Sequence, residues 1–149
     1  RSRRLSMFRH ILIPTDCTER THNALKIALR LYELEKGQSG LERITLLHVI
    51  ETISDDSGPE FEKFYSSLQK KAQKKMQALL QDYAQDAPLR QEILLGNRVQ
   101  EILNFSQEQQ VDLIVLSSHQ IDYENPAQGW GTISHKVGIL APCPVMLVK

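Results

Sequence analysis

Five short apolar segments are separated along the chain by amphipathic stretches with helical spacing. Most of these segments are nearly uninterrupted by polar residues, which is typical of strands buried on both faces of a parallel sheet. Because helices must then cover both faces of the sheet, the alternation predicts an α/β fold. The expected strands are 11–14, 44–50, 89–95, 113–116 and 145–148, of which 89–95 is the more polar and edge-like.

The stretches between these segments predict four helices. Thr18 is expected to cap the first, whose apolar side carries Ala24, Ala28 and Leu31. Right-handed crossovers favour a doubly wound, open five-stranded parallel sheet with helices on both faces, a Rossmann-like arrangement. The expected inward-facing residues are Phe61, Phe64, Tyr65, Leu68, Ala72, Met76, Leu79, Leu80 and Tyr83 in the second helix, Val99, Ile102, Leu103 and Ser106 in the third, and Ile133, Val137 and Leu140 in the fourth, which should run from about Thr132 to Leu140.

Composition narrows the class of protein. The 149 residues suffice for one domain, since a domain of this size buries roughly two-thirds of its unfolded surface. The 18 basic and 18 acidic residues cancel, which argues against nucleic acid or an anionic membrane as partner. Cys17 and Cys143 lie outside any Cys-x-x-Cys pattern, so a reducing, cytoplasmic location is expected. Residues 1–6 are interpreted as a disordered arm or a cloning remnant, and 7–149 as the domain.

Two loops are expected to form any ligand site. In an open parallel sheet, ligands bind beyond the carboxyl ends of the strands, where the strand order reverses. The loops that meet this condition are 15–18, after the first strand, and 117–130, after the fourth. The second loop leads into Gly131 and Thr132, just before the fourth helix. Free N–H groups there could hold a phosphate, or Thr132 could cap an ordinary helix, and geometry leaves both open.

Several enzyme signatures are missing from the sequence. It contains no Gly-x-x-x-x-Gly-Lys-Ser/Thr loop, no Gly-x-Gly-x-x-Gly after the first strand and no Gly-x-Ser-x-Gly elbow. Ser117, Ser118, His119 and Asp122 include the residue types of a hydrolytic triad, but neighbours on one loop rarely converge as nucleophile, base and orienting group. The histidines show no paired metal-ligand spacing, so no metal site is expected.

Four segments taken together resemble the universal stress protein family, and they cover nearly all of the chain from Met7 to Lys149. The first segment, 10–18 with Ala24 and Leu25, is similar to the family's Pro-x-Asp-Gly-Ser start, and the second, 46–49, is similar to its second strand. The third segment, Gly96 with Ile102 and 112–115, is similar to the family's third helix and fourth strand. The last, 131–132 with 141–145, is similar to its Gly-Ser/Thr helix and Ala-Pro-Cys-Pro-Val ending.

The resemblance implies an adenine nucleotide alpha hydrolase-like fold, a homodimer formed through the last strand, Val145–Val148, and a site for ATP or another adenine nucleotide, with Mg²⁺ if it accompanies the nucleotide. Asp16 would face the adenine or ribose, and Val49 the adenine through its backbone. The implied nucleotide-binding residues are Pro14, Thr15, Asp16, Val49, Ser117, Ser118, His119, Gly129, Gly131, Thr132 and Ile133.

The chain departs from the family in its phosphate loop. ATP-binding members carry Gly-x-x-Gly and then, at a fixed spacing, Gly-Ser/Thr. Here Ser117 and Gln120 occupy the first two glycine positions, and the gap to Gly131 is one residue longer. If these positions need positive φ, each substitution costs about 1 kcal/mol, which weakens phosphate binding without abolishing it. The hydroxyls of Ser117, Ser118 and Thr132 could bind the phosphate in place of the glycine loop.

Three functions are therefore compared. The first is a nucleotide-responsive stress protein that binds without turnover. The alternative is a homodimeric stress or interaction protein of the same fold that binds no nucleotide, which the replaced glycines motivate. Slow ATP hydrolysis is the third, with Asp16 as the one acidic candidate for a base near the adenosine.

Overall fold

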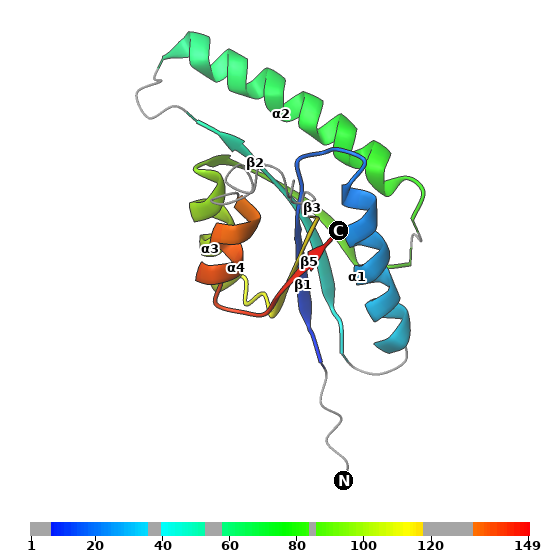
Figure 1. Ribbon diagram of the computed structural model, residues 1–149. Coiled ribbons are helices and arrows are strands. Elements are labelled where there is room, and N and C mark those ends of the chain that lie inside the picture. Colours follow the sequence, from blue (N-terminus) through cyan, green and yellow to red (C-terminus); the bar gives the residue numbers. More distant parts are fainter. Residues whose placement is uncertain (1–6, 36–39, 53–57, 84–85, 118–132) are drawn as a thin grey trace, which may run out of the picture.

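A computed structural model describes residues 7–35, 40–52, 58–83, 86–117 and 133–149. The predicted alternation of strands and helices is confirmed in these residues (Figure 1). In chain order the elements are β1 (His10–Pro14), α1 (Thr21–Glu35), β2 (Arg43–Glu51), α2 (Pro59–Leu80), β3 (Leu89–Gly96), α3 (Arg98–Glu108), β4 (Leu113–Ser117), α4 (Ile133–Leu140) and β5 (Val145–Val148).

The strands form one parallel sheet in the order β3-β2-β1-β4-β5. Strand β1 lies at the centre, where Ile11 is in register with Ile44 of β2 and with Leu113 of β4. The chain first builds outward from β1 through β2 to β3, and then returns to the other side of β1. This confirms the doubly wound α/β fold, and it places the reversal of strand order between β1 and β4.

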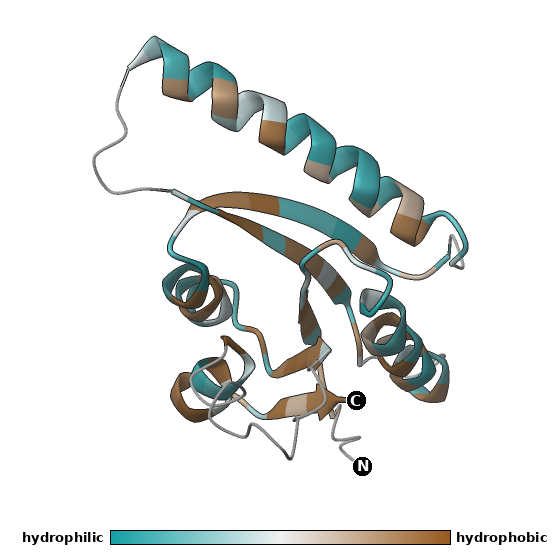
Figure 2. Ribbon diagram, turned by 45° about the horizontal axis from the view of Figure 1, so that its top comes forward, coloured by the Kyte–Doolittle hydropathy of each residue, from teal (hydrophilic) through white to brown (hydrophobic). Residues whose placement is uncertain are grey.

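The strands carry apolar side chains on both faces, as β1 shows. Ile11 and Ile13 belong to a core that includes residues of α1 and Met76 of α2, whereas Leu12 belongs to a second core with Ile102 of α3 and Val137 of α4. Helices α1 and α2 therefore cover one face and α3 and α4 the other (Figure 1). Figure 2 shows the hydrophobic residues concentrated along the central strands, with much of α2 hydrophilic.

Only the second half of α2 packs as expected. Its buried residues are Ala72, Met76 and Leu79. Phe61 and Phe64, predicted to face the core, are 38% and 56% exposed. Apolar spacing continues into the first turns of this helix, but these turns lie beyond the region where it is buried against the sheet. Within the described residues, no helix combines the length and apolar character needed to cross a membrane.

Two other helix details differ from expectation. Helix α1 begins at Thr21 rather than directly after Thr18, because the Thr21 N–H donates to the Thr18 carbonyl (3.1 Å) in a tight turn. The residue directly before α1 is Arg20, so Thr18 is not the predicted helix cap, and its hydroxyl donates to Asp16 Oδ1 (2.6 Å) instead. In α4, Val137 is fully buried, but Leu140 is 60% exposed because the helix ends there.

Candidate functional site

A cleft of about 360 Å³ opens at the carboxyl ends of the strands, where the strand order reverses. Its volume is within the range of small-ligand sites, roughly 300–1,000 Å³. The cleft is therefore at the place that the fold predicts for a ligand. Its lining residues are Pro14, Thr15, Asp16, Arg20, Thr21, Leu47, Val49, Arg98, Ile102, Leu116, Ser117, Ile133 and Ser134.

The wall of this cleft combines apolar and polar groups. Val49, Ile102 and Leu116 supply aliphatic surface that comes from β2, α3 and β4 respectively. Two arginines, Arg20 and Arg98, supply positive charge. An aliphatic wall beside hydroxyls and guanidinium groups suits a molecule with a flat apolar ring and an anionic group.

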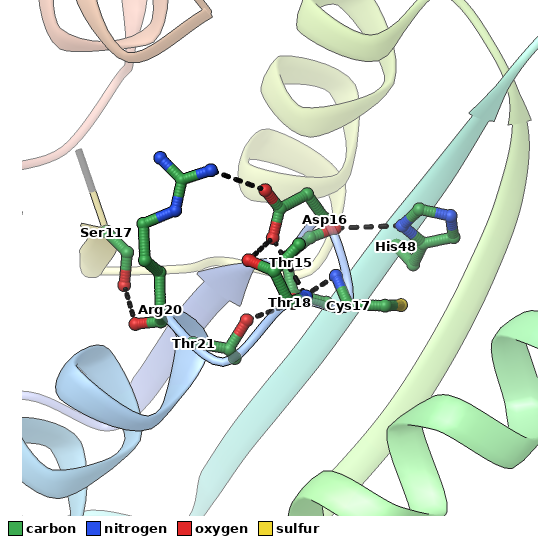
Figure 3. A network of polar contacts seen from close by, with 8 residues as sticks. All are labelled: Thr15, Asp16, Cys17, Thr18, Arg20, Thr21, His48 and Ser117. Carbon is green, nitrogen blue, oxygen red and sulfur yellow. Dashed lines mark hydrogen bonds and ion pairs between the residues drawn. The ribbon is translucent and has the colours of Figure 1, made fainter. Parts of the chain in front are cut away.

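The loop after β1 is fixed to its neighbours by hydrogen bonds (Figure 3). The Thr15 N–H donates to the Leu47 carbonyl of β2 (2.8 Å), and His48 Nδ1 donates to the Thr15 carbonyl (2.8 Å). The Thr15 hydroxyl also bonds that of Thr21, at the first residue of α1. The loop is thus held to both elements beside it, which gives the cleft a preformed wall.

Cys17 turns the chain within this loop. It has a φ of 64°, in the left-handed region, and its N–H donates to Thr15 Oγ1 (2.9 Å). A residue with a Cβ pays about 1–2 kcal/mol for this conformation, and the stress-protein motif has glycine at this position. Burial raises the pKa of the Cys17 thiol to about 11, so the thiol is protonated near neutral pH and is a poor nucleophile.

Asp16 presents an ionised carboxylate to the cleft. Its Oδ1 accepts hydrogen bonds from the N–H of Thr18 (3.0 Å) and from the Thr18 hydroxyl (2.6 Å), and its Oδ2 lies 3.7 Å from Nη2 of Arg20 (Figure 3). Partial burial raises the pKa of Asp16, but the hydrogen bonds from Thr18 and the charge of Arg20 outweigh burial and hold this pKa below its ordinary value. A carboxylate held in this form accepts protons weakly.

Ser117 is tied to the start of α1. Its hydroxyl donates to the backbone carbonyl of Arg20 (2.6 Å), which joins the end of β4 to the segment that leads into α1 (Figure 3). The hydroxyl hydrogen is therefore used within the protein. That Ser117 also contacts a phosphate stays a prediction.

The structure brings part of the predicted site together. Pro14, Thr15, Asp16, Val49, Ser117 and Ile133 all line the cleft. The other predicted positions, together with Gln120 and Asp122, lie outside the described residues. That any of these residues contacts a nucleotide stays a prediction. The positions outside the described residues are Ser118, His119, Gly129, Gly131 and Thr132.

Sequence reasoning missed the two arginines. Arg20 precedes α1 by one residue, and Arg98 is the first residue of α3, directly after Asn97, whose side chain caps that helix by accepting the Gln100 N–H (3.0 Å). The sequence feature that indicates them is a basic residue at the start of a helix that follows a strand, as Arg20 does before α1 and Arg98 does in α3. Because parallel crossovers gather such helix starts at one edge of the sheet, this signal could have indicated that both arginines lie near the ligand loops.

Comparison with known proteins agrees with this geometry. The family model described as "Universal stress protein family" matches residues 7–149. Universal stress protein YxiE of Bacillus subtilis (strain 168) is 27% identical over 154 residues, which covers 96% of this chain and 100% of the relative. The solved structure of the hypothetical protein MJ0577 superposes with a TM-score of 0.77 at 26% identity and covers 96% of both chains.

More distant solved structures share the fold and contain adenine nucleotides. A universal stress protein in complex with cAMP has a TM-score of 0.63 at 14% identity and covers 97% of this chain and 99% of its own. A universal stress protein from Archaeoglobus fulgidus in complex with dAMP has a TM-score of 0.57 at 15% identity, covering 96% and 99%. With a family model that matches residues 7–149 and a cleft at the reversal of a five-stranded parallel sheet, the chain belongs to the universal stress protein family.

Proposed function

We propose that this universal stress protein binds an adenine nucleotide in the cleft between the ends of β1 and β4, and that it responds to the nucleotide without turning it over. The observation that carries the proposal is the cleft itself, which combines an aliphatic wall with two arginines at the strand-order reversal. The complexes of related folds with cAMP and dAMP support adenine as the base.

Each end of the cleft has a proposed role. The adenine lies against Val49, Ile102 and Leu116, and the ribose lies near Thr15 and Asp16. Val49 is only 2% exposed, so a base in the cleft would meet mostly its backbone and a small part of its side chain. Backbone recognition of this kind reads the edge of the base, which favours adenine over guanine.

Binding without hydrolysis is supported by the chemistry of Asp16. Hydrolysis needs a group that removes a proton from the attacking water. Asp16 is the single carboxylate among the described residues that line the cleft, and it accepts hydrogen bonds from Thr18 and pairs with Arg20. A carboxylate with a lowered pKa is a weak base, so turnover is not expected from it.

Magnesium enters the proposal only together with the nucleotide. Within the described part of the chain, no three His, Cys, Asp or Glu side chains gather as metal ligands. Mg²⁺ is commonly held by one or two carboxylates, water and substrate phosphates. With Asp16 as its single carboxylate, the described wall would depend on phosphate oxygens to hold the ion.

The test is calorimetric titration of the purified protein with ATP, ADP and AMP, with and without Mg²⁺, with GMP as the control ligand. Saturable heat with the adenine nucleotides and a thermal shift on binding are expected, with little response to GMP. No heat and no thermal shift at about millimolar nucleotide would contradict nucleotide binding. A dissociation constant of about 1 mM corresponds to a binding free energy of only about −4 kcal/mol.

A second candidate is a homodimeric interaction protein with no nucleotide function. The exposed apolar edge strand β5 favours it, since Met146 and Leu147 are 37% and 43% exposed there. Dimerisation through β5 is compatible with either function. Absence of nucleotide binding in a protein that dimerises would favour this candidate. A cytoplasmic location is part of both proposals and is supported by two free cysteines, Cys17 and Cys143.

A further inference from the structure

We propose that Arg20 binds the phosphate of the nucleotide and so takes over the anion-binding task that other members give to the glycines replaced here by Ser117 and Gln120. The proposal rests on the proposed nucleotide function and assigns its ligand class: a phosphorylated adenine nucleotide rather than adenosine. It makes Arg20 a specificity-determining residue of the cleft.

The first argument is the charge of the cleft. Its described wall holds three charged side chains, Arg20, Arg98 and Asp16. Each guanidinium group has one carboxylate near it, because Arg20 lies 3.7 Å from Asp16 and Arg98 lies 3.9 Å from Glu51. What the wall offers an anionic ligand is therefore two guanidinium groups, whose N–H donors suit phosphate oxygens.

The second argument is how Arg20 is positioned. Its backbone carbonyl accepts the Ser117 hydroxyl (2.6 Å), which anchors the residue to the end of β4. In Figure 3 the side chain of Arg20 extends from this anchored backbone toward Asp16, across the loop that follows β1. Ser117, at the first replaced glycine position, therefore acts as a positioning residue for Arg20, and its hydroxyl need not touch the phosphate.

The third argument is that the contact of Arg20 with Asp16 is loose enough to exchange for a phosphate. The Nη2 and Oδ2 atoms are 3.7 Å apart, and the two side chains are 43% and 47% exposed. Half-exposed pairs of this kind contribute little to stability. A guanidinium group can bind two phosphate oxygens at once, which a single carboxylate oxygen at this distance does not match.

Arg98 supplies a second guanidinium group from another part of the wall. Its Nε lies 3.9 Å from Oε1 of Glu51, and its side chain is 37% exposed. This contact is also long. Arg98 and Arg20 belong to segments that approach the cleft from the α3 side and the α1 side, so the two guanidinium groups reach it from different parts of the chain.

The experiment compares Arg20→Gln with Arg30→Gln by titrating each with adenosine, AMP and ADP at one ionic strength. Arg30 is an exposed residue of α1 outside the cleft, so both variants lose one positive charge from neighbouring parts of the chain. We expect Arg20→Gln to weaken AMP and ADP binding by about tenfold or more, and to leave adenosine within about twofold. Arg30→Gln should bind all three ligands like the unaltered protein.

Two further measurements separate a binding role from a structural one. Arg20→Lys keeps the charge and should recover part of the lost AMP affinity, and urea unfolding should show Arg20→Gln to be as stable as Arg30→Gln. Equal weakening of adenosine and AMP by Arg20→Gln, or unchanged AMP binding, would overturn the assignment while nucleotide binding itself stood. Failure of the unaltered protein to bind AMP or ADP would instead contradict the proposed function.

Discussion

At the scale of single residues, His10 joins three parts of the chain where β1 begins. It is 3% exposed, its Nδ1 donates to the Gln109 carbonyl (3.0 Å), and its Nε2 accepts the Thr45 hydroxyl (2.7 Å). The N–H groups of Arg9 and His10 donate to the two carboxylate oxygens of Asp112 (2.8 and 3.0 Å). With a neutral ring Nε2 accepts from Thr45, whereas a protonated ring would have to donate there and the buried Thr45 hydroxyl hydrogen would have to turn away.

This geometry predicts that the protein loses stability in mild acid. Burial lowers the pKa of His10 below its ordinary value of 6.5, with Arg43 and Arg90 acting in the same direction and the Gln109 carbonyl and Asp112 opposing. The unfolded chain then takes up a proton near pH 6.5 that the folded chain refuses. The free energy of unfolding should therefore be fully retained above this pH and fall as the pH drops toward the folded pKa.

Urea unfolding at about pH 7.5 and about pH 5.5 checks this prediction, with His10→Gln as the comparison. The glutamine variant should be less stable at the higher pH, because it fills the site less well. It should also lose less stability on acidification, because its side chain does not titrate. An equally steep loss in both proteins would show that His10 is not the group responsible.

Residue roles in the site were only partly predictable from the sequence. Thr15 and Asp16 are predicted because their loop follows a clear buried strand, and Pro14, at the end of that strand, is predicted from the family resemblance. The hydrogen bond of Ser117 is not predictable from the sequence, because a hydroxyl has several possible partners. Only the folded chain brings it to the Arg20 carbonyl, 97 residues away. Arg20 is missed because the cleft that it lines is formed with residues distant in the sequence, such as Val49 and Ile102.

At the scale of elements, the existence and order of helices and strands followed from periodicity, and their ends did not. The spacing of apolar residues indicates which side of a helix is hydrophobic, but it does not indicate how far the sheet extends beneath that helix. Phe61 and Phe64 therefore matched the buried stripe of α2 and are nevertheless exposed. Helix α1 begins later than predicted because the chain first makes a tight turn, in which the Thr21 N–H donates to the Thr18 carbonyl.

The connection between β3 and α3 gives a prediction at this scale. Gly96 ends β3 with a φ of +151°, which side-chain-bearing residues rarely adopt, and an added Cβ would lie 2.8 Å from Glu101 Cγ. The Glu101 side chain can move, so the backbone strain decides the cost. We expect Gly96→Ala to lower the free energy of unfolding by about 1–3 kcal/mol, as measured by urea titration.

A glycine inside a helix provides the matched control. Gly138 lies within α4, and nothing is within 4 Å of an added Cβ. Gly138→Ala should raise the free energy of unfolding by about 0.5–1 kcal/mol, because alanine restricts the unfolded chain and suits a helix. The same exchange is thus expected to have opposite signs at the two sites. A Gly96→Ala protein as stable as Gly138→Ala would refute the strain argument.

At the scale of the whole molecule, the topology was predictable because few arrangements satisfy the constraints. Unbroken apolar strands must be covered on both faces, and right-handed crossovers leave little choice of strand order. The position of the cleft followed from this order. Its volume and the two arginines on its wall did not, since they depend on side chains that six separate elements bring together.

The two edges of the sheet differ, and this difference predicts how the molecule associates. At one edge, β3 exposes the polar residues Arg90, Gln91 and Glu92, which discourage pairing with another chain. At the other edge, β5 exposes Met146 and Leu147 at 37% and 43%, with apolar residues exposed at the adjoining end of α4. Proteins usually cover such an apolar edge, so β5 is the expected contact between two copies.

Light scattering at micromolar concentration should therefore show a dimer, and Leu147→Lys should convert it to a monomer by placing an unpaired charge in the contact. Leu34→Lys is the matched control, because Leu34 is 71% exposed and belongs to α1 and not to the edge strand β5. It should leave the dimer intact. A monomeric unaltered protein would contradict association altogether, whereas a Leu147→Lys protein that remained dimeric would place the contact on another surface. If nucleotide affinity is unchanged in the Leu147→Lys monomer, the cleft is complete within one chain, as expected from a wall built by its own strands and helices.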